Sequence, residues 1–151
     1  EGDILPFMKE TLKKLKLSPD NVIMELTETY LAQEDGSIQE AISELKRIGI
    51  QLAMDDFGTG YSSLFSLKNM PVNVVKIDRG FVKEITTDMF NATFIRTITQ
   101  LCHEVGKTVC LEGVESAEEY NVVKYSGIEL IQGYYFGKPM SAADFEEKYF
   151  K

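Results

Sequence analysis

Two adjacent carboxylates, Asp55 and Asp56, close the apolar run 50–54 and are followed at once by the glycine-bearing turn 57–61. Two charges at the end of a strand cannot both be buried in apolar surroundings unless something neutralises them. The pair is therefore expected either to cap the next helix or to hold a cation. The choice between these two roles decides what chemistry this part of the chain performs.

The other segments that the sequence predicts as strands also end in polar side chains. Parallel strands bring the residues at their C-terminal ends to one edge of the sheet, where α/β folds build their sites. Oxygen ligands without histidine or cysteine favour Mg²⁺ or Mn²⁺ over zinc. Independent helix caps would not need to occur at every strand, so a shared cation site is the favoured interpretation. The residues at this edge are Glu25, Glu28, Asp55, Asp56, Lys76, Asp78, Glu112, Glu115 and Gln132.

The elements that must position these residues alternate between strands and helices. Apolar runs predict strands, and apolar spacing near 3.6 residues predicts helices, three of which end at a glycine. Ser116 and Glu119 have the spacing of a capping box. Helical crossovers between the strands predict a parallel sheet. Strands are expected at 22–26, 50–54, 72–77, 108–111 and 128–131, and helices at about 3–15, 37–48, 62–68, 88–105 and 116–125, with a last helix capped by Ser141.

Five such βα units leave the architecture open. A complete (β/α)8 barrel typically needs about 250 residues, whereas the chain has 151. A complete doubly wound sheet would fit this length, and so would about five-eighths of a barrel. The pattern of strands and helices alone does not separate these two α/β folds.

Composition narrows the class of protein. The net charge of −8 disfavours non-specific binding to DNA, RNA or anionic membranes. No apolar run reaches the ~20 residues of a membrane span, and no signal-peptide pattern opens the chain. Cys102 and Cys110 have no metal-binding spacing and are expected to be reduced thiols of a cytoplasmic protein. Because the chain begins at Glu1 rather than Met, a longer parent protein is expected.

Five segments, taken together in their order and spacing, resemble the motifs of the EAL domain, a family of bacterial cyclic di-GMP phosphodiesterases. They are Glu25-Leu-Thr-Glu28, the DDFGTGYSSL stretch at 55–64, Lys76-Ile-Asp-Arg79, Glu112-Gly-Val-Glu115 and Gln132-Gly-Tyr-Tyr-Phe-Gly-Lys-Pro139. The resemblance implies a TIM-like (β/α)8 barrel of the EAL type, of which residues 1–151 form the C-terminal part, about three-fifths of a single domain. The family's Glu-Ala-Leu signature and a metal-binding asparagine lie upstream, so the N-terminal strands are missing.

The resemblance also implies a metal site. Glu25 and Asp55 would hold one Mg²⁺ or Mn²⁺ ion together with the upstream Glu and Asn. Asp55, Asp56 and Glu112 would hold a second ion, with Asp55 bridging the pair. Two metal ions suit phosphodiester hydrolysis, because both the attacking and the leaving oxygen need charge stabilisation.

Further roles follow from the same resemblance. Lys76 would orient and acidify the attacking water, Gln132 would position water or phosphate, and Glu112 would act beside them as a metal ligand. Glu28, Asp78 and Glu115 would support the site. The implied reaction converts cyclic di-GMP into linear pGpG in the parent protein. The isolated 151-residue chain is expected to be inactive, because five strands cannot close a barrel.

Other functions stay open at this stage. A catalytically silent EAL domain would bind cyclic di-GMP or a protein partner, and the missing upstream Glu decides between silence and activity. Carboxylates on successive strands facing a lysine would also suit an enolase-like barrel that abstracts a proton next to a carboxylate. A homodimer is expected through the region after the 57–63 loop, where Leu64, Phe65 and Leu67 serve either a partner surface or the core. The aromatic run 134–136 would either stack a base or pack at the rim.

Overall fold

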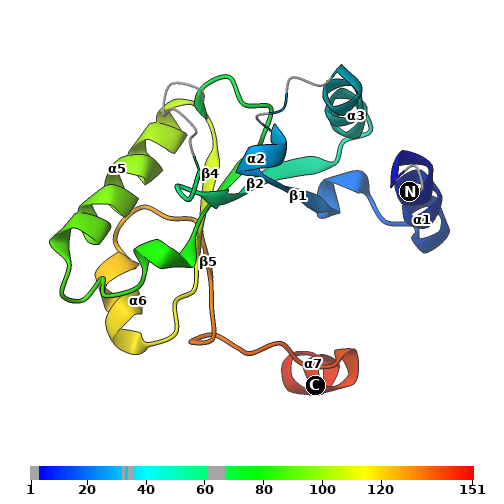
Figure 1. Ribbon diagram of the computed structural model, residues 1–151. Helices are drawn as coiled ribbons and strands as arrows, with labels where there is room; N and C mark the ends of the chain where they lie inside the picture. The colour runs from blue at the N-terminus through cyan, green and yellow to red at the C-terminus, as the bar shows by residue number, and fades with distance from the viewer. Residues whose placement is uncertain (1–3, 32, 34–35, 61–66) are drawn as a thin grey trace.

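The computed structural model of the protein describes residues 4–31, 33, 36–60 and 67–151 (Figure 1). Its strands lie side by side in the order of the chain and are all parallel. A doubly wound sheet reverses its strand order at a switch point, whereas a barrel runs sequentially. The strand order therefore identifies the sheet as an arc of an incomplete barrel. The strands are β1 (Ile23–Thr27), β2 (Gln51–Phe57), β3 (Val74–Ile77), β4 (Thr108–Glu112) and β5 (Leu130–Gln132).

Helices alternate with these strands, as the sequence predicts. The capping box at the start of α6 is confirmed, since the Ser116 side chain and Glu119 bond each other's backbone N–H groups. None of the described helices has the length and apolar character needed to cross a membrane. Of the helix expected at 62–68, residues 62–66 lie outside the described residues. The helices are α1 (Ile4–Leu15), α2 (Glu28–Leu31), α3 (Gly36–Arg47), α5 (Met89–Glu104), α6 (Ala117–Val123) and α7 (Ala142–Tyr149), with 3-10 turns η1 (Pro19–Asn21) and η2 (Arg79–Phe81).

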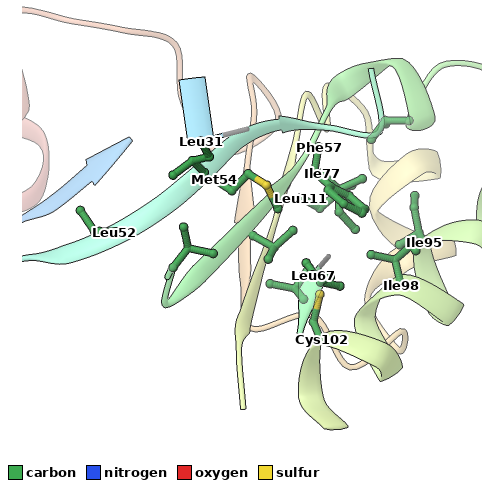
Figure 2. Close-up of a cluster of buried hydrophobic side chains, with 14 of the residues drawn as sticks. Leu31, Leu52, Met54, Phe57, Leu67, Ile77, Ile95, Ile98, Cys102 and Leu111 are labelled. Atoms are coloured by element: carbon green, nitrogen blue, oxygen red, sulfur yellow. The ribbon is translucent and has the colours of Figure 1, made fainter. Parts of the chain in front are cut away.

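One face of the sheet carries the core (Figure 2). Alternate residues of each strand point to this face and pack on the apolar side of the helices, α5 above all. Full burial of each large apolar side chain contributes about 1.5–3 kcal/mol, so this face holds the sheet together. Members of the cluster are Leu52, Met54, Phe57, Val75, Ile77, Val109 and Leu111 from the strands and Ile95, Ile98 and Cys102 from α5.

The opposite face of the sheet is of a different kind. Its buried apolar residues are small, namely Ala53, Val74 and Cys110, and they form a separate cluster. Side chains alternate between the two faces along a strand. Because Met54 points to the helices, Asp55 points to this second face. The strand-end polar residues therefore lie on the face that corresponds to the interior of a barrel.

Strand β2 is longer than the expected 50–54 and contains an irregularity. It continues through both aspartates to Phe57, and its pairing with β3 shifts between Met54 and Phe57. Asp56 has a φ of 57°, in the left-handed region. The adjacent aspartates thus sit in a bulge, a feature that the apolar pattern of the strand did not indicate.

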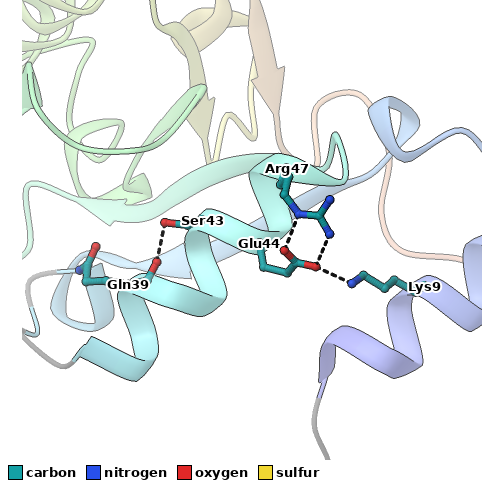
Figure 3. A network of polar contacts seen from close by, with 5 residues as sticks. All are labelled: Lys9, Gln39, Ser43, Glu44 and Arg47. Atoms are coloured by element: carbon teal, nitrogen blue, oxygen red, sulfur yellow. Dashed lines mark hydrogen bonds and ion pairs between the residues drawn. The ribbon is translucent and has the colours of Figure 1, made fainter.

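Helix α1 is held to α3 by a polar network (Figure 3). Glu44 Oε1 lies 2.5 Å from Lys9 Nζ, and Glu44 Oε2 accepts a hydrogen bond from Arg47 Nε at 2.7 Å. Hydrogen bonds from Arg47 and Lys9 lower the pKa of Glu44 to about 2, so this carboxylate stays charged at neutral and mildly acidic pH. Exposed ion pairs add little stability, so the network mainly orients α1 on α3.

The backbone after β5 is packed so closely that a side chain at Gly133 would overlap Val114. The Val114 N–H donates to Gln132 O at 3.2 Å, and the Tyr135 N–H donates to Val114 O at 3.0 Å, so Val114 is fixed. We expect Gly133→Ala to lower the free energy of unfolding by about 3 kcal/mol. Urea denaturation would measure this loss. Gly36→Ala is the matched control, because a Cβ there meets nothing within 4 Å; a wild-type midpoint for Gly133→Ala would contradict the prediction.

Candidate active site

Lys76 lies at the centre of the strand-end residues. Its side chain is only 6% exposed, and its Nζ contacts three carboxylates: Glu25 Oε2 at 2.7 Å, Asp55 Oδ1 at 2.9 Å and Glu112 Oε1 at 2.6 Å. These partners come from β1, β2 and β4, so a single ammonium group joins four neighbouring strands. Lys76 therefore brings together Glu25, Asp55 and Glu112, all of which the sequence predicts at this edge of the sheet.

A small residue allows this arrangement. Glu25 belongs to β1 and Lys76 to β3, so the ion pair between them crosses β2. The β2 partner of Glu25 in the strand register is Ala53. Its single methyl group leaves room above the sheet for both long side chains to meet. Sequence reasoning did not single out Ala53, and the only signal was a small residue within an otherwise bulky run.

The surroundings of Lys76 decide its charge. Burial alone would lower the pKa of this lysine, but the hydrogen bonds to Glu112, Glu25 and Asp55 outweigh burial and raise the pKa above its usual value. Lys76 is therefore a fixed ammonium ion at neutral pH. It can donate hydrogen bonds and stabilise negative charge, but it cannot accept a proton as a base.

Asp55, Asp56 and Glu112 form a second group beside this lysine. Each offers one carboxylate oxygen, and these oxygens all lie within 4.8 Å of one another. Consecutive residues of a regular strand point to opposite faces, so Asp55 and Asp56 could not share a site on an ideal strand. The bulge with its positive φ at Asp56 turns both carboxylates to the same side.

The donor set fits a hard divalent cation. The carboxylates of Glu25, Asp55 and Glu112 contact one ammonium group, and that of Asp56 lies beside Asp55 and Glu112, so negative charge is in excess. Their ligand atoms are all oxygen, which favours Mg²⁺, Mn²⁺ or Ca²⁺ over zinc. Cys110 lies on the same face of the sheet, but burial raises the pKa of its thiol to about 11, so it stays protonated and is a poor ligand.

Glu28 supports the turn that follows the aspartates. It opens the short helix α2, which the sequence did not predict, and is 5% exposed. Its Oε2 accepts a hydrogen bond from the Gly58 N–H at 3.3 Å. A Cβ on Gly60 would lie 2.5 Å from Glu28 Oε1, so the turn passes close over this carboxylate. Glu28 therefore contacts the turn that carries the aspartates, and its supporting role in catalysis stays a prediction.

The other predicted residues, Asp78, Glu115 and Gln132, lie at the periphery of this group. Asp78 accepts a hydrogen bond from the Gly80 N–H at 2.8 Å and caps η2. Glu115 is exposed before α6, and Gln132 is exposed on β5, opposite Glu112 in the register. Of the acids predicted at this edge, three contact Lys76 in the described part of the chain, namely Glu25, Asp55 and Glu112. Of the other acids, Asp78 caps a 3-10 turn and Glu28 accepts from the turn after the aspartates.

The aromatic run 134–136 packs partly on α6. The Tyr135 ring stacks on Tyr120 with ring centroids 5.4 Å apart, and Phe136 meets Tyr120 edge-on at 5.6 Å. Tyr134 and Phe136 also line an open cleft of about 760 Å³ that begins at Gln132 and continues along α7. Rim packing is thus observed for part of the run, while base stacking stays a prediction.

The EAL domain family model matches residues 1–139. The chain belongs to the EAL domain family. Membership confirms the α/β barrel fold and the family that the strand-end motifs indicated.

Several relatives share this EAL sequence and its fold. The cyclic di-GMP phosphodiesterase PdeR of Escherichia coli is 36% identical over 97% of the chain, which covers 22% of PdeR. A solved structure of the PaMucR phosphodiesterase in complex with c-di-GMP has a TM-score of 0.82 at 32% identity. The alignment covers 91% of this chain and 56% of the PaMucR chain. The manganese and cyclic di-GMP complex of Klebsiella pneumoniae BlrP1 has a TM-score of 0.84 at 32% identity, over 92% of this chain and 36% of BlrP1. The chain thus spans about a fifth of PdeR and little more than half of the PaMucR chain.

Proposed function

We propose that the protein containing this EAL chain hydrolyses one phosphodiester bond of cyclic di-GMP to give linear pGpG. The observation that carries the proposal is the group of Asp55, Asp56 and Glu112 joined to the buried Lys76 ammonium. A cluster of carboxylates with one cation beside it suits metal-assisted hydrolysis of a phosphodiester. The names of the relatives support this substrate, since PdeR is a cyclic di-GMP phosphodiesterase and PaMucR was solved with c-di-GMP.

The proposed roles divide the chain's own residues into ligands and donors. Glu25 and Asp55 would hold one Mg²⁺ or Mn²⁺ ion, and Asp55, Asp56 and Glu112 a second. When bound, such ions stabilise charge on the phosphate oxygens and make water a better nucleophile. The three N–H donors of Lys76 are directed at Glu25, Asp55 and Glu112. With these carboxylates on metal ions, the ammonium would turn an N–H to the attacking water and orient it, while the exposed amide of Gln132 would bind water or a phosphate oxygen.

The extent of the domain and its partners belong to the same proposal. We infer that residues 1–151 form about the C-terminal three-fifths of a single EAL domain. A Glu and an Asn upstream of these residues would complete the first metal site. The 56% coverage of the PaMucR chain supports this division. The homodimer would form through the segment after the 57–63 loop. Leu64 and Phe65 lie outside the described residues, but Leu67 is buried and so belongs to the core.

The test compares the full-length protein with residues 1–151 expressed alone. We expect the full-length protein to convert cyclic di-GMP into pGpG only with Mg²⁺ or Mn²⁺, and the isolated chain to give no turnover, because its metal site is incomplete. Chromatographic separation of cyclic di-GMP, pGpG and GMP would measure this. Metal-dependent turnover by a monomeric isolated chain would contradict the incomplete site. Binding of cyclic di-GMP by the full-length protein without hydrolysis would instead favour the silent receptor.

A further inference from the structure

The aromatic ring of Phe81 lies against the turn that follows the aspartates. Gly58 has a φ of 95°, and a Cβ built on it would lie 2.6 Å from Phe81 Cε2 and 2.8 Å from Phe81 Cζ. These distances are shorter than any real carbon contact, so the Gly58 backbone rests against the edge of the Phe81 ring. Glycine is required at this position both for its conformation and for this close approach.

The Phe81 ring cannot move away from the turn. It stacks on Phe94 of α5 with ring centroids 4.2 Å apart and an angle of 7° between the planes. Phe81 is the last residue of η2, and the next residue, Val82, is 1% exposed and belongs to the core. The Asp78 side chain caps the start of this 3-10 turn. The ring is therefore fixed by α5 on one side and by its own backbone on the other.

The same turn sets the position of a proposed metal ligand. Gly58 follows Asp56 after one residue, Phe57, whose side chain is buried in the core. The Thr59 N–H and Oγ1 both donate to Asp56 O, at 3.2 and 2.9 Å, which closes the turn on the aspartate. The turn therefore has two supports, the Glu28 carboxylate that accepts from Gly58 and the Phe81 ring that Gly58 rests on.

We propose that Phe81 is a positioning residue for the metal site. Contact with the Phe81 ring fixes the position of the Gly58 backbone. This contact thereby keeps Asp56 in the left-handed conformation that places its carboxylate beside Asp55 and Glu112. Phe81 itself touches neither metal nor substrate. This inference rests on the proposed function, because it assumes that the three carboxylates bind a divalent cation.

The direct test measures Mn²⁺ binding by the full-length protein. Electron paramagnetic resonance reports free Mn²⁺ and needs no turnover. We expect Phe81→Leu to weaken Mn²⁺ binding about 10-fold, as loss of a residue that orients a ligand does. The kcat at low Mn²⁺ should fall and recover at high Mn²⁺, with KM for cyclic di-GMP unchanged. A merely structural loss would lower the melting temperature in EDTA but leave the Mn²⁺ affinity of the folded protein unchanged. If Phe81→Leu does not fold, Phe81→Met, which has a similar volume but no flat ring, replaces it.

Phe90 provides the matched control. Its ring also stacks on Phe94, with centroids 6.3 Å apart, and its side chain is 68% exposed. Phe90→Leu removes a member of the same aromatic stack without touching the turn. Its Mn²⁺ affinity should equal that of the wild type.

A double-mutant cycle isolates the contact itself. Gly58→Ala should weaken Mn²⁺ binding, both through strain at positive φ and through the clash with the Phe81 ring. In a Phe81→Leu background the clash is relieved, so the same substitution should weaken binding by a smaller factor. Independent, multiplying effects would overturn the proposal, as would wild-type Mn²⁺ affinity in both Phe81 variants. If the wild type itself binds no Mn²⁺, the proposed function fails rather than the role of Phe81.

Discussion

Lys76→Met is expected to lower the kcat for cyclic di-GMP hydrolysis by about 10³-fold, within the range for loss of a group that handles the proton of a reacting water. Methionine keeps much of the length and apolar volume of lysine but removes the ammonium group. The water would then lose the donor that orients it, and Glu25, Asp55 and Glu112 would lose their shared counter-charge. The kcat at saturating Mn²⁺ measures the effect, with Lys83→Met, at an exposed position, as the control.

Stability gives a second measure of the same substitution. Removing one partner of a largely buried ion pair leaves uncompensated charge, so the free energy of unfolding should fall by about 3 kcal/mol in EDTA. Added Mn²⁺ should restore part of it, because the ion replaces the lost positive charge. In the wild type the raised pKa of Lys76 means that its ion pairs contribute fully below the ordinary lysine pKa of 10.5 and lose strength only as the pH rises through the higher folded value. Wild-type kcat in Lys76→Met would refute the role of the ammonium group.

Asp56→Asn should separate activity from stability. We expect it to lower kcat/KM at a fixed low Mn²⁺ concentration by at least about 10²-fold, because the site loses a charged ligand. The melting temperature in EDTA should stay the same or rise. Asparagine tolerates the φ of 57° as well as aspartate does, and its neutral amide removes repulsion from Asp55 and Glu112. Mn²⁺ titrations of the rate and thermal melts in EDTA measure the two quantities.

Two further variants sharpen this experiment. Asp56→Ala should lose the same activity and also stability, because alanine disfavours a positive φ. Asp20→Asn, at an exposed position in η1, removes the same charge elsewhere and should leave both quantities unchanged. An unaltered Mn²⁺ dependence in Asp56→Asn would mean that Asp56 is no ligand. A lower melting temperature would mean that repulsion among the carboxylates is not what the substitution relieves.

Local patterns predicted much of this fold. Alternation of strands and helices follows from apolar spacing and from end signals such as Gly49, whose φ of 93° suits the turn after α3. The strand-end residues could be found because a parallel sheet brings all its C-terminal ends to one edge. Lys76, Asp55 and Glu112 meet for this reason. A motif of several residues, rather than any one of them, carried the assignment to a family.

Features that depend on distant residues could not be predicted in this way. The order of the strands, which separates a barrel from a doubly wound sheet, is set by packing between segments and not by the content of any one. The bulge at Asp56 depends on contacts of the turn 57–60 with Glu28 and Phe81. Glu28 lies 30 residues before Gly58, and Phe81 lies well after it in the sequence. Phe81 reads locally as one more apolar residue after a strand. Its positioning role follows only from its stacking on Phe94 and its contact with the Gly58 backbone.

The sequential strand order has a consequence for how the site is made during synthesis. Each strand pairs with its neighbour along the chain, from Ile23 with Gln51 to Cys110 with Leu130, so each new βα unit can dock as soon as it is translated. The site, however, takes one piece from every unit, and Gln132 on β5 comes last. A nascent chain would thus carry the carboxylate cluster before the catalytic edge is whole. The protein is expected to become able to bind metal before it becomes able to cleave its substrate.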